Sequence, residues 1–147
     1  MVEILIAVAI IVISTLAAMS VSSKSISTAQ RAVHITQANF LLEEGAEAAR
    51  IIRDGGWTGV SNLITSTNYY FVWSGGTWTA STTPSTIGIF TRTTTVSPVN
   101  RDATTQDISP TGVNDPGTKL ITITVSWPEG GNTVSKNLKF YLSNIFQ

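Results

Sequence analysis

The first twenty-three residues constrain the fold of this chain more than any other feature. From Ile4 to Ser23 the sequence carries no charge and is mostly apolar. A helix over Val2–Ser23 would be roughly 33 Å long, which is about the thickness of the hydrocarbon core of a bilayer. The segment therefore predicts a helix that needs lipid, or other protein, around it.

One carboxylate, Glu3, stands at the front of this apolar run. A secretory signal peptide has basic residues first, a shorter apolar core and a small-residue cleavage site. Here an acidic residue comes first, and no basic residue precedes Lys24. The pattern favours a helix with two environments, one in a bilayer and one packed in a protein assembly.

Residues 1–54 are predicted to form one long helix, since neither Pro nor Gly occurs before Gly45. Its length would be about 80 Å, and Gly55–Gly56 is expected to end it. Hydroxyl side chains that compete with the helical ladder predict bending or local melting in the middle. These are Ser20, Ser22, Ser23, Ser25, Ser27 and Thr28.

The second half of this helix is expected to present an apolar stripe against which a soluble domain packs. The predicted stripe consists of Ile26, Ala29, Val33, Phe40, Leu41, Ala48, Ile51 and Ile52.

After Trp57 the sequence has the patterns of β-strands. Residues 69–73 and 77–80 flank Ser74-Gly75-Gly76 and predict a hairpin. Residues 87–99 form a longer strand that Pro98 should end or confine to a sheet edge. Residues 120–127 place Ile121, Ile123, Val125 and Trp127 on one face, and residues 133–142 align Val134, Leu138, Phe140 and Leu142.

Asn100–Gly117 is polar and rich in Pro and Gly, and it is expected to be a long loop. The fold class is therefore α+β, with a long N-terminal helix, its hydrophobic half protruding, packed against a small antiparallel β-sheet head. Three segments are expected: a hydrophobic helix (1–23), an amphipathic continuation (24–56) and a globular sheet head (57–147).

Composition excludes several classes of function. The 147 residues have a net charge of zero and only 12% charged residues, which argues against electrostatically driven nucleic-acid binding. Without cysteine there is neither a disulfide framework nor a cysteine metal site. No Asn-x-Ser/Thr acceptor occurs, so a glycan would have to be O-linked, for which the Ser/Thr-dense region 77–111 is the candidate.

The segment MVEILIAVAIIVI resembles the N-terminus of mature type IV pilins and of the pseudopilins of type II secretion. In that family an apolar helix carries one glutamate near its start, which corresponds to Glu3. The stretches LLEEGAEAARIIRDGGW, IFTRTTTVSPVNRD and LITITVSWPEGG also look like pilin-like proteins. Only Met1 and Val2 precede Glu3, whereas the family usually has four residues there, and no basic leader ending in glycine is present.

The resemblance implies a structural subunit, without catalytic activity or cofactor, that polymerises with itself into an extracellular type IV pilus-like filament on the cell surface. Before assembly it would be anchored in the inner membrane, trimmed by a prepilin peptidase and handled by pilus assembly machinery. Glu3 would pair with the amine of a neighbouring chain, at Met1. The core-packing residues would be Ile4, Leu5, Ile6, Val8, Ile10, Ile11, Val12, Ile13 and Leu16.

Two related functions remain open beside this one. A pseudopilin of a secretion system would share the helix and build a short periplasmic structure. A minor pilin would act as an adhesive or DNA-binding module, which a neutral composition does not favour.

Other residue groups have alternative interpretations. Glu43, Glu44 and Glu47 with Arg50, Arg53 and Asp54 resemble an acid–base cluster, but the spacings Glu47–Arg50 and Arg50–Asp54 favour helical ion pairs. His34 is the only histidine, and no nucleophile motif accompanies it.

Oxygen-bearing side chains crowd the predicted loop, and such loops can hold calcium, as in some pseudopilins. They are Asn100, Asp102, Asp107, Asn114 and Asp115. The same residue types serve turns, and their spacing fits no EF-hand, so our expectation is that there is no metal site. The aromatic residues Trp57, Trp73, Trp78, Trp127, Tyr69, Tyr70 and Phe71 are expected mostly to fill the core.

Overall fold

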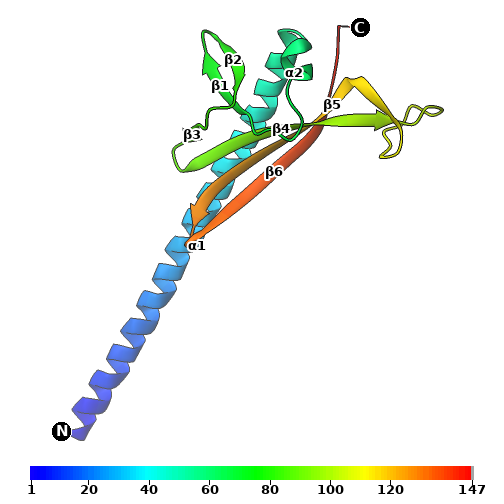
Figure 1. Ribbon diagram of the computed structural model, residues 1–147. Helices are drawn as coiled ribbons and strands as arrows, with labels where there is room; N and C mark the ends of the chain where they lie inside the picture. Colours follow the sequence, from blue (N-terminus) through cyan, green and yellow to red (C-terminus); the bar gives the residue numbers. More distant parts are fainter. Residues whose placement is uncertain (147) are drawn as a thin grey trace. The chain divides into compact units, whose positions relative to one another are not determined.

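A computed structural model describes residues 1–146 (Figure 1). Two helices come first, α1 (Val2–Asp54) and α2 (Thr58–Ser61). The strands follow as β1 (Tyr70–Ser74), β2 (Thr77–Ser81), β3 (Thr86–Ile87), β4 (Phe90–Arg101), β5 (Val113–Glu129) and β6 (Asn132–Ser143). The chain thus combines a long N-terminal apolar helix with a small antiparallel sheet, which confirms the α+β class.

The chain divides into two compact units. The amino-terminal unit is Met1–Gln37, and the carboxy-terminal unit begins at Ala38. The boundary falls inside α1, and within the segment 24–56 that the sequence suggested as a continuation of the helix. The two units are described separately below.

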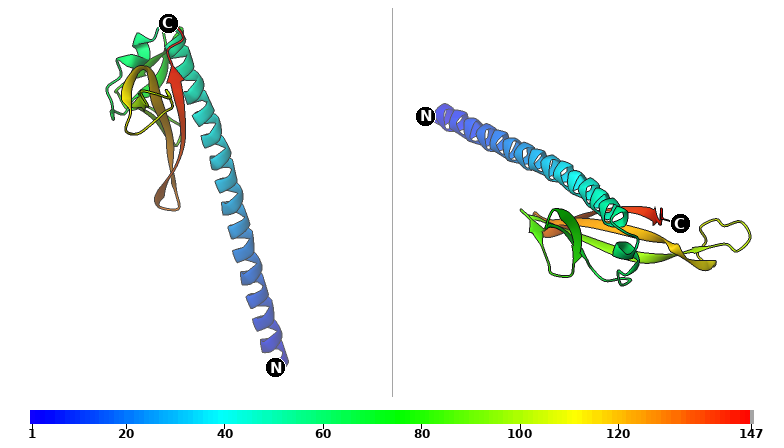
Figure 2. Two further views of the ribbon diagram at one scale, coloured as in Figure 1. Left: turned by 90° about the vertical axis from the view of Figure 1, so that its right-hand side faces the viewer. Right: turned by 90° about the horizontal axis from the view of Figure 1, so that it is seen from above.

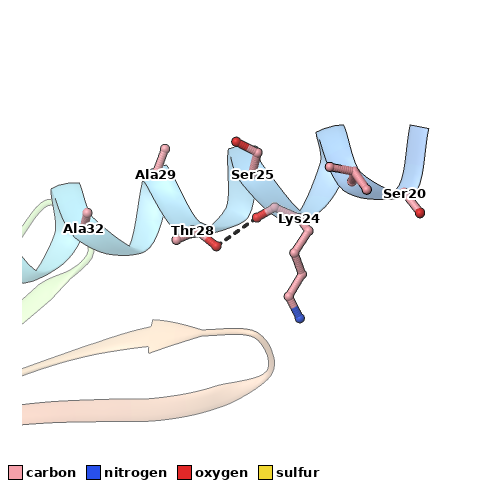
Figure 3. Close-up of a pocket in the computed structure, with 7 residues that line it drawn as sticks. Ser20, Lys24, Ser25, Thr28, Ala29 and Ala32 are labelled. Carbon is pink, nitrogen blue, oxygen red and sulfur yellow. Dashed lines mark hydrogen bonds between the residues drawn. The ribbon is translucent and has the colours of Figure 1, made fainter. Parts of the chain in front are cut away.

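Helix α1 is continuous through the serine-rich stretch, so the predicted local melting there is wrong. The hydroxyls of Ser20 and Ser27 donate to the carbonyls of Ala17 and Lys24, at 2.8 and 2.9 Å. Thr28 Oγ1 donates to the same Lys24 carbonyl at 2.9 Å (Figure 3). Each hydroxyl is satisfied by a carbonyl of the preceding turn, and the helical ladder is kept.

In the carboxy-terminal unit, the main sheet has four antiparallel strands in the order β3-β4-β5-β6, and β1 and β2 form a separate hairpin. Figure 2 shows the long strands β4, β5 and β6 running side by side. Two-residue turns with positive φ join β1 to β2 (Gly75–Gly76) and β5 to β6 (Gly130–Gly131). Only residues that tolerate the left-handed region suit such turns, which explains the paired glycines.

Alternation along the central strands divides the sheet into two faces. On β5 the buried apolar residues are Ile121, Ile123, Val125 and Trp127, as the sequence predicted. On β6 the predicted inward set, Val134, Leu138, Phe140 and Leu142, is the less exposed face, although only Leu142 is fully buried. The core of the carboxy-terminal unit lies on this face.

The structure corrects the predicted strand over 87–99 and overturns one of the two alternatives for Pro98. The strand expected over 87–99 is interrupted at Gly88. This residue has a φ of 60° and lies in the turn that connects β3 to the antiparallel strand β4. Pro98 does not end β4, which continues to Arg101 with a register shift between Pro98 and Val99. Beyond Thr91 this edge of β4 meets only Tyr69, which bridges to Thr94, and Ser66, whose N–H donates to the Val96 carbonyl. Pro98 lies on the same side of β4 as Thr94, so its missing N–H falls on a sheet edge.

The long loop expected over Asn100–Gly117 is also shorter than predicted. Strand β4 extends to Arg101, β5 begins at Val113, and only residues 102–112 connect them. Asn100 pairs with Asn114, and Val99 with Asp115. The pattern of a loop arises here because none of the first five residues of β5, 113–117, is buried, so this end of the strand has no apolar alternation.

The apolar stripe predicted for α1 is largely wrong. Of its members only Ala48 is buried, and Leu41 and Ile52 are half-buried, whereas Phe40 and Ile51 are exposed. In the carboxy-terminal unit the helix instead buries a face of small residues and one leucine: Ala38, Leu42, Gly45, Ala46, Ala48 and Ala49. A Cβ on Gly45 would lie 3.1 Å from both Arg92 Cδ and Ile123 Cγ2. Small side chains therefore allow the helix to lie directly on β4 and β5.

Candidate assembly surface

The amino-terminal unit leaves its apolar side chains uncovered. Every residue from Met1 to Val33 is exposed. The nine predicted core-packing residues have exposed fractions between 49% (Val12) and 70% (Leu5); they are Ile4, Leu5, Ile6, Val8, Ile10, Ile11, Val12, Ile13 and Leu16. Exposed apolar surface of this extent marks a protein or membrane interaction site.

By its length and composition, α1 meets the criteria for a helix that can cross a membrane, and its most apolar window is entirely unburied. The same criteria are met by signal sequences and by core helices of soluble proteins. The complete exposure of this window sets α1 apart from a buried core helix.

Glu3 lies in the first turn of α1, where its negative charge is favourable to the helix dipole. Its side chain and Met1 are both exposed. Within residues 1–146 no cation forms an ion pair with Glu3. The carboxylate is therefore available to a partner outside this chain.

Three carboxylates on the second half of α1 are paired with arginines, namely Glu44, Glu47 and Asp54, and Glu43 is exposed. Glu47 pairs with Arg50, as predicted, and Glu44 Oε2 lies 3.3 Å from Arg92 Nη1. The predicted Arg50–Asp54 pair is wrong. Asp54 pairs with Arg53 instead, with 2.8 Å between Asp54 Oδ1 and Arg53 Nη2. The Arg50 guanidinium lies 5.7 Å from the centre of the Phe140 ring. This cluster is a set of structural ion pairs.

Two of the candidate calcium ligands, Asp102 and Asp115, are engaged by their own chain. Asp102 Oδ1 accepts the backbone N–H groups of Thr104 and Thr105 at 2.8 and 3.0 Å, and these bonds lower the pKa of Asp102. Asp115 accepts Arg101 Nε at 2.7 Å, and chiefly through this bond its pKa is lowered too.

The structure places Asp102, Asn114 and Asp115 around one surface hollow, together with Arg101. Asp107 does not line that hollow. Within the described chain, residues 1–146, no three His, Cys, Asp or Glu side chains converge as a metal site would require. With a guanidinium bound to Asp115, the hollow suits a hydrogen-bonded turn better than a dication.

The remaining predicted residues divide between core and surface. Trp127 is buried beside Phe90, with ring centres 5.7 Å apart, and its Nε1 donates to Glu129 at 2.9 Å. Trp73 is 60% exposed and meets Trp78 edge to face at 5.8 Å. His34 is half-buried. Core filling thus accounts for only part of the aromatic residues.

Sequence reasoning missed Arg92, which is only 4% exposed. Its guanidinium donates to the carbonyls of Leu41 and Phe71, at 3.3 and 3.2 Å, and lies 5.4 Å from the centre of the Trp78 ring. It joins α1, the β1–β2 hairpin and β4. The alternation Phe90, Arg92, Thr94, Val96 was the available signal, because it places Arg92 on the buried face.

Comparison with protein-family models, with curated proteins and with solved structures finds no match to this chain.

Proposed function

We propose that this protein is a structural subunit that polymerises through its N-terminal helix into an extracellular filament of the type IV pilus kind. One observation carries the proposal: an unbroken helix that is exposed from Val2 to Val33 and uncharged from Ile4 to Ser23, with one carboxylate, Glu3, at its start.

Such a surface is not stable in water. Each Å² of apolar surface removed from water contributes roughly 25 cal/mol, so the exposed helix favours either a bilayer or a bundle of like helices. A polymer whose centre consists of these helices removes the surface from water without lipid. The carboxy-terminal unit, which has its own core, then forms the outer surface of the polymer.

Glu3 gives this association a preferred register. A carboxylate moved into an apolar environment is costly unless it is paired. The amine at the terminus of a neighbouring chain, at Met1, offers an opposite charge at the same end of an identical helix. In the polymer, pairing with the amine removes the free-energy cost of the buried Glu3 carboxylate. In the isolated membrane form the carboxylate stays unpaired and the cost remains. This difference favours the addition of subunits to the polymer.

The resemblance of the N-terminal segment to type IV pilins and pseudopilins supports this proposal, and so does the α+β layout of a long helix with a small antiparallel sheet. The subunit would be held in the inner membrane by residues 1–23 before assembly and processed by a prepilin peptidase. It would have no catalytic activity and would need no cofactor, and its main partner would be itself. A pseudopilin, which would build a short periplasmic structure instead, is the rival.

The test compares polymer yield for Glu3→Gln and Glu3→Ala with the unmodified chain. Glu43→Gln is the matched control, because Glu43 is an exposed carboxylate on the same helix in the carboxy-terminal unit. Both Glu3 variants should reach the membrane in normal amounts and give at most about a tenth of the surface filament, a loss equivalent to roughly 1.4 kcal/mol or more per contact. Normal filament from both variants would refute the role of Glu3, and periplasmic polymers alone would favour the pseudopilin.

A further inference from the structure

The β1–β2 hairpin presents a tryptophan to solvent. Trp73 is 60% exposed, although tryptophan side chains are on average highly buried in folded proteins. It pairs in register with Trp78 on β2, so the two indoles lie on the same face of the hairpin. A Cβ on either glycine of the Gly75–Gly76 turn would meet no further atom within 4 Å. The space around this end of the hairpin, which Figure 1 shows beside the main sheet, is therefore open.

The orientation of this indole is fixed from below. The ring planes of Trp73 and Trp78 are inclined by 74°, so at least one face of the Trp73 ring is not covered by Trp78. The half-buried Trp78 in turn packs on the guanidinium of Arg92, which is itself buried and donates to the Phe71 carbonyl of the same hairpin. A ligand that stacks on Trp73 therefore has little side-chain freedom to remove.

Both indoles of the hairpin keep a hydrogen-bond donor available. Within residues 1–146, neither the Trp73 nor the Trp78 N–H donates to another group of the protein, whereas Trp127 Nε1 donates to Glu129. Indole N–H groups that are removed from water usually find a partner. The hairpin thus combines an open aromatic face with polar donors at the edge of the rings.

The part of the chain that carries these tryptophans has no charge. From Gly55 to Thr91 the sequence contains no Asp, Glu, Lys, Arg or His, and α2, β1, β2 and β3 all lie within this stretch. The next charge, on Arg92, is buried and lies 3.3 Å from Glu44. A charged ligand would lose hydration at the hairpin without gaining an opposite charge. The surface therefore favours a neutral ligand.

A neutral sugar has the chemistry that this surface matches. A pyranose ring has a face of C–H groups, which packs on an aromatic ring, and an edge of hydroxyls, which accept hydrogen bonds from indole N–H groups. A purely aliphatic ligand would leave the two donors unused. A nucleic-acid base would also stack, but it brings phosphates that need cations, and the hairpin has none.

We infer that the end of the β1–β2 hairpin is a binding site for a neutral, hexopyranose-containing oligosaccharide, with Trp73 as the stacking platform. Trp78 and Arg92 are positioning residues, since they hold the platform. The inference goes beyond the proposed function, because it assigns a ligand to the carboxy-terminal unit and requires neither a polymer nor a membrane.

The test titrates the full-length chain in detergent with cellohexaose, chitohexaose and maltohexaose, and follows binding by saturation-transfer NMR of the sugar protons. At least one of the three should bind with a dissociation constant of about 1 mM or below. Trp73→Leu, which keeps an apolar side chain but no ring, should weaken that binding about tenfold, and Trp73→Phe should stay within about threefold of the unmodified chain. Ile64→Ala, at an exposed position of the same uncharged stretch outside the hairpin, is the control and should bind normally.

Three results would overturn the sugar site. The first is no binding of any of the three neutral hexasaccharides. The second is equal binding by the unmodified chain and Trp73→Leu, because the ring would then take no part. The third is binding of the anionic hexagalacturonate as tightly as the best neutral sugar, because an uncharged platform should not retain it. Far-UV circular dichroism of each variant shows that a loss of binding is not a loss of fold.

A second measurement separates the sugar site from self-assembly. The yield of surface filament from Trp73→Leu should equal that of the unmodified chain, because the platform binds sugar and not a second copy. Loss of filament together with no sugar binding would assign Trp73 to a contact between copies and overturn the inference. Sugar binding by a chain that forms no filament would support the inference and refute the proposed function, and filaments without sugar binding would do the reverse.

Discussion

The two units of this chain solve the problem of apolar surface in opposite ways. In the carboxy-terminal unit, α1 buries a face of alanine and glycine against β4 and β5 of its own chain. In the amino-terminal unit, the same helix is lined with isoleucine, leucine and valine, and none of these is covered up to Val33. Apart from Leu42, small residues make the intramolecular contact of α1, whereas large aliphatic residues are exposed in the amino-terminal unit.

The most direct way to break this comparison is to truncate one isoleucine in each unit. Ile123 is fully buried, so Ile123→Ala should lower the unfolding free energy by about 2–5 kcal/mol. Ile26 is exposed, so Ile26→Ala should change it by no more than about 0.5 kcal/mol.

Urea unfolding of the full chain in detergent, followed by tryptophan fluorescence and far-UV circular dichroism, measures both variants. All four tryptophans lie in the carboxy-terminal unit, so fluorescence reports on its core. An equal loss from the two substitutions would mean that Ile26 is covered within the subunit, contrary to the comparison.

Arg92 sharpens the description of the intramolecular contact. Arg92→Ala removes the donor to the Leu41 and Phe71 carbonyls, the ion pair with Glu44 and the packing on Trp78. The expected loss is about 2–4 kcal/mol, since buried acceptors lose a charged donor. Arg50→Ala, in an exposed ion pair, is the control and should cost less than about 1 kcal/mol. Similar losses from both would show that Arg92 does not join these elements.

Gly45 tests whether close approach of helix and sheet is required. In Gly45→Val the new side chain would meet Arg92 and Ile123, and the expected destabilisation is about 1–3 kcal/mol. Thermal unfolding measures it, with Ala29→Val as the matched change on the exposed part of the helix. Unchanged stability in Gly45→Val would indicate a looser contact than the structure shows.

The smallest expected effect is the acid sensitivity of the Arg101–Asp115 pair. The pKa of Asp115 is lowered from its ordinary 3.8 mainly by the hydrogen bond from Arg101. The pair therefore contributes stability above the unfolded-state pKa, and this contribution is lost as the pH falls through the lower folded-state pKa. It should be below about 1 kcal/mol because the groups are partly solvated.

Asp115→Asn should remove the contribution of this pair to the loss of stability at low pH. Asp107→Asn, in the neighbouring loop, should leave that contribution unchanged. Unfolding curves between neutral pH and about pH 2 provide the measurement. An unchanged pH profile in Asp115→Asn would contradict the assignment.

The sequence predicted the fold class, the full extent of α1, the β1–β2 and β5–β6 hairpins and the buried face of β5. These follow from local rules: paired glycines at turns, strict alternation along Ile121–Trp127 and the absence of helix breakers before Gly45. The buried face of α1 could not be predicted in the same way. Hydrophobicity pointed to Val33 and Phe40, whereas the contact uses Gly45 and Ala49 because close approach to the sheet leaves no room for larger side chains.

The candidate site was easier to locate than to interpret. Glu3 and the apolar segment were evident from composition alone, and the structure adds their exposure. Beyond the apolar segment, Ile26 and Val33 are exposed among polar residues, whereas the sequence predicted that they would pack against the soluble domain.

The most direct test of the account is to shear surface material from intact cells, image it and determine the intact mass of its principal protein. The account predicts long fibres composed of this chain, with the peptide that contains Glu3 at or very near the amino terminus. If the chain remained in the cell envelope, and the sheared fraction held neither the fibres nor this protein, the filament proposal would be contradicted.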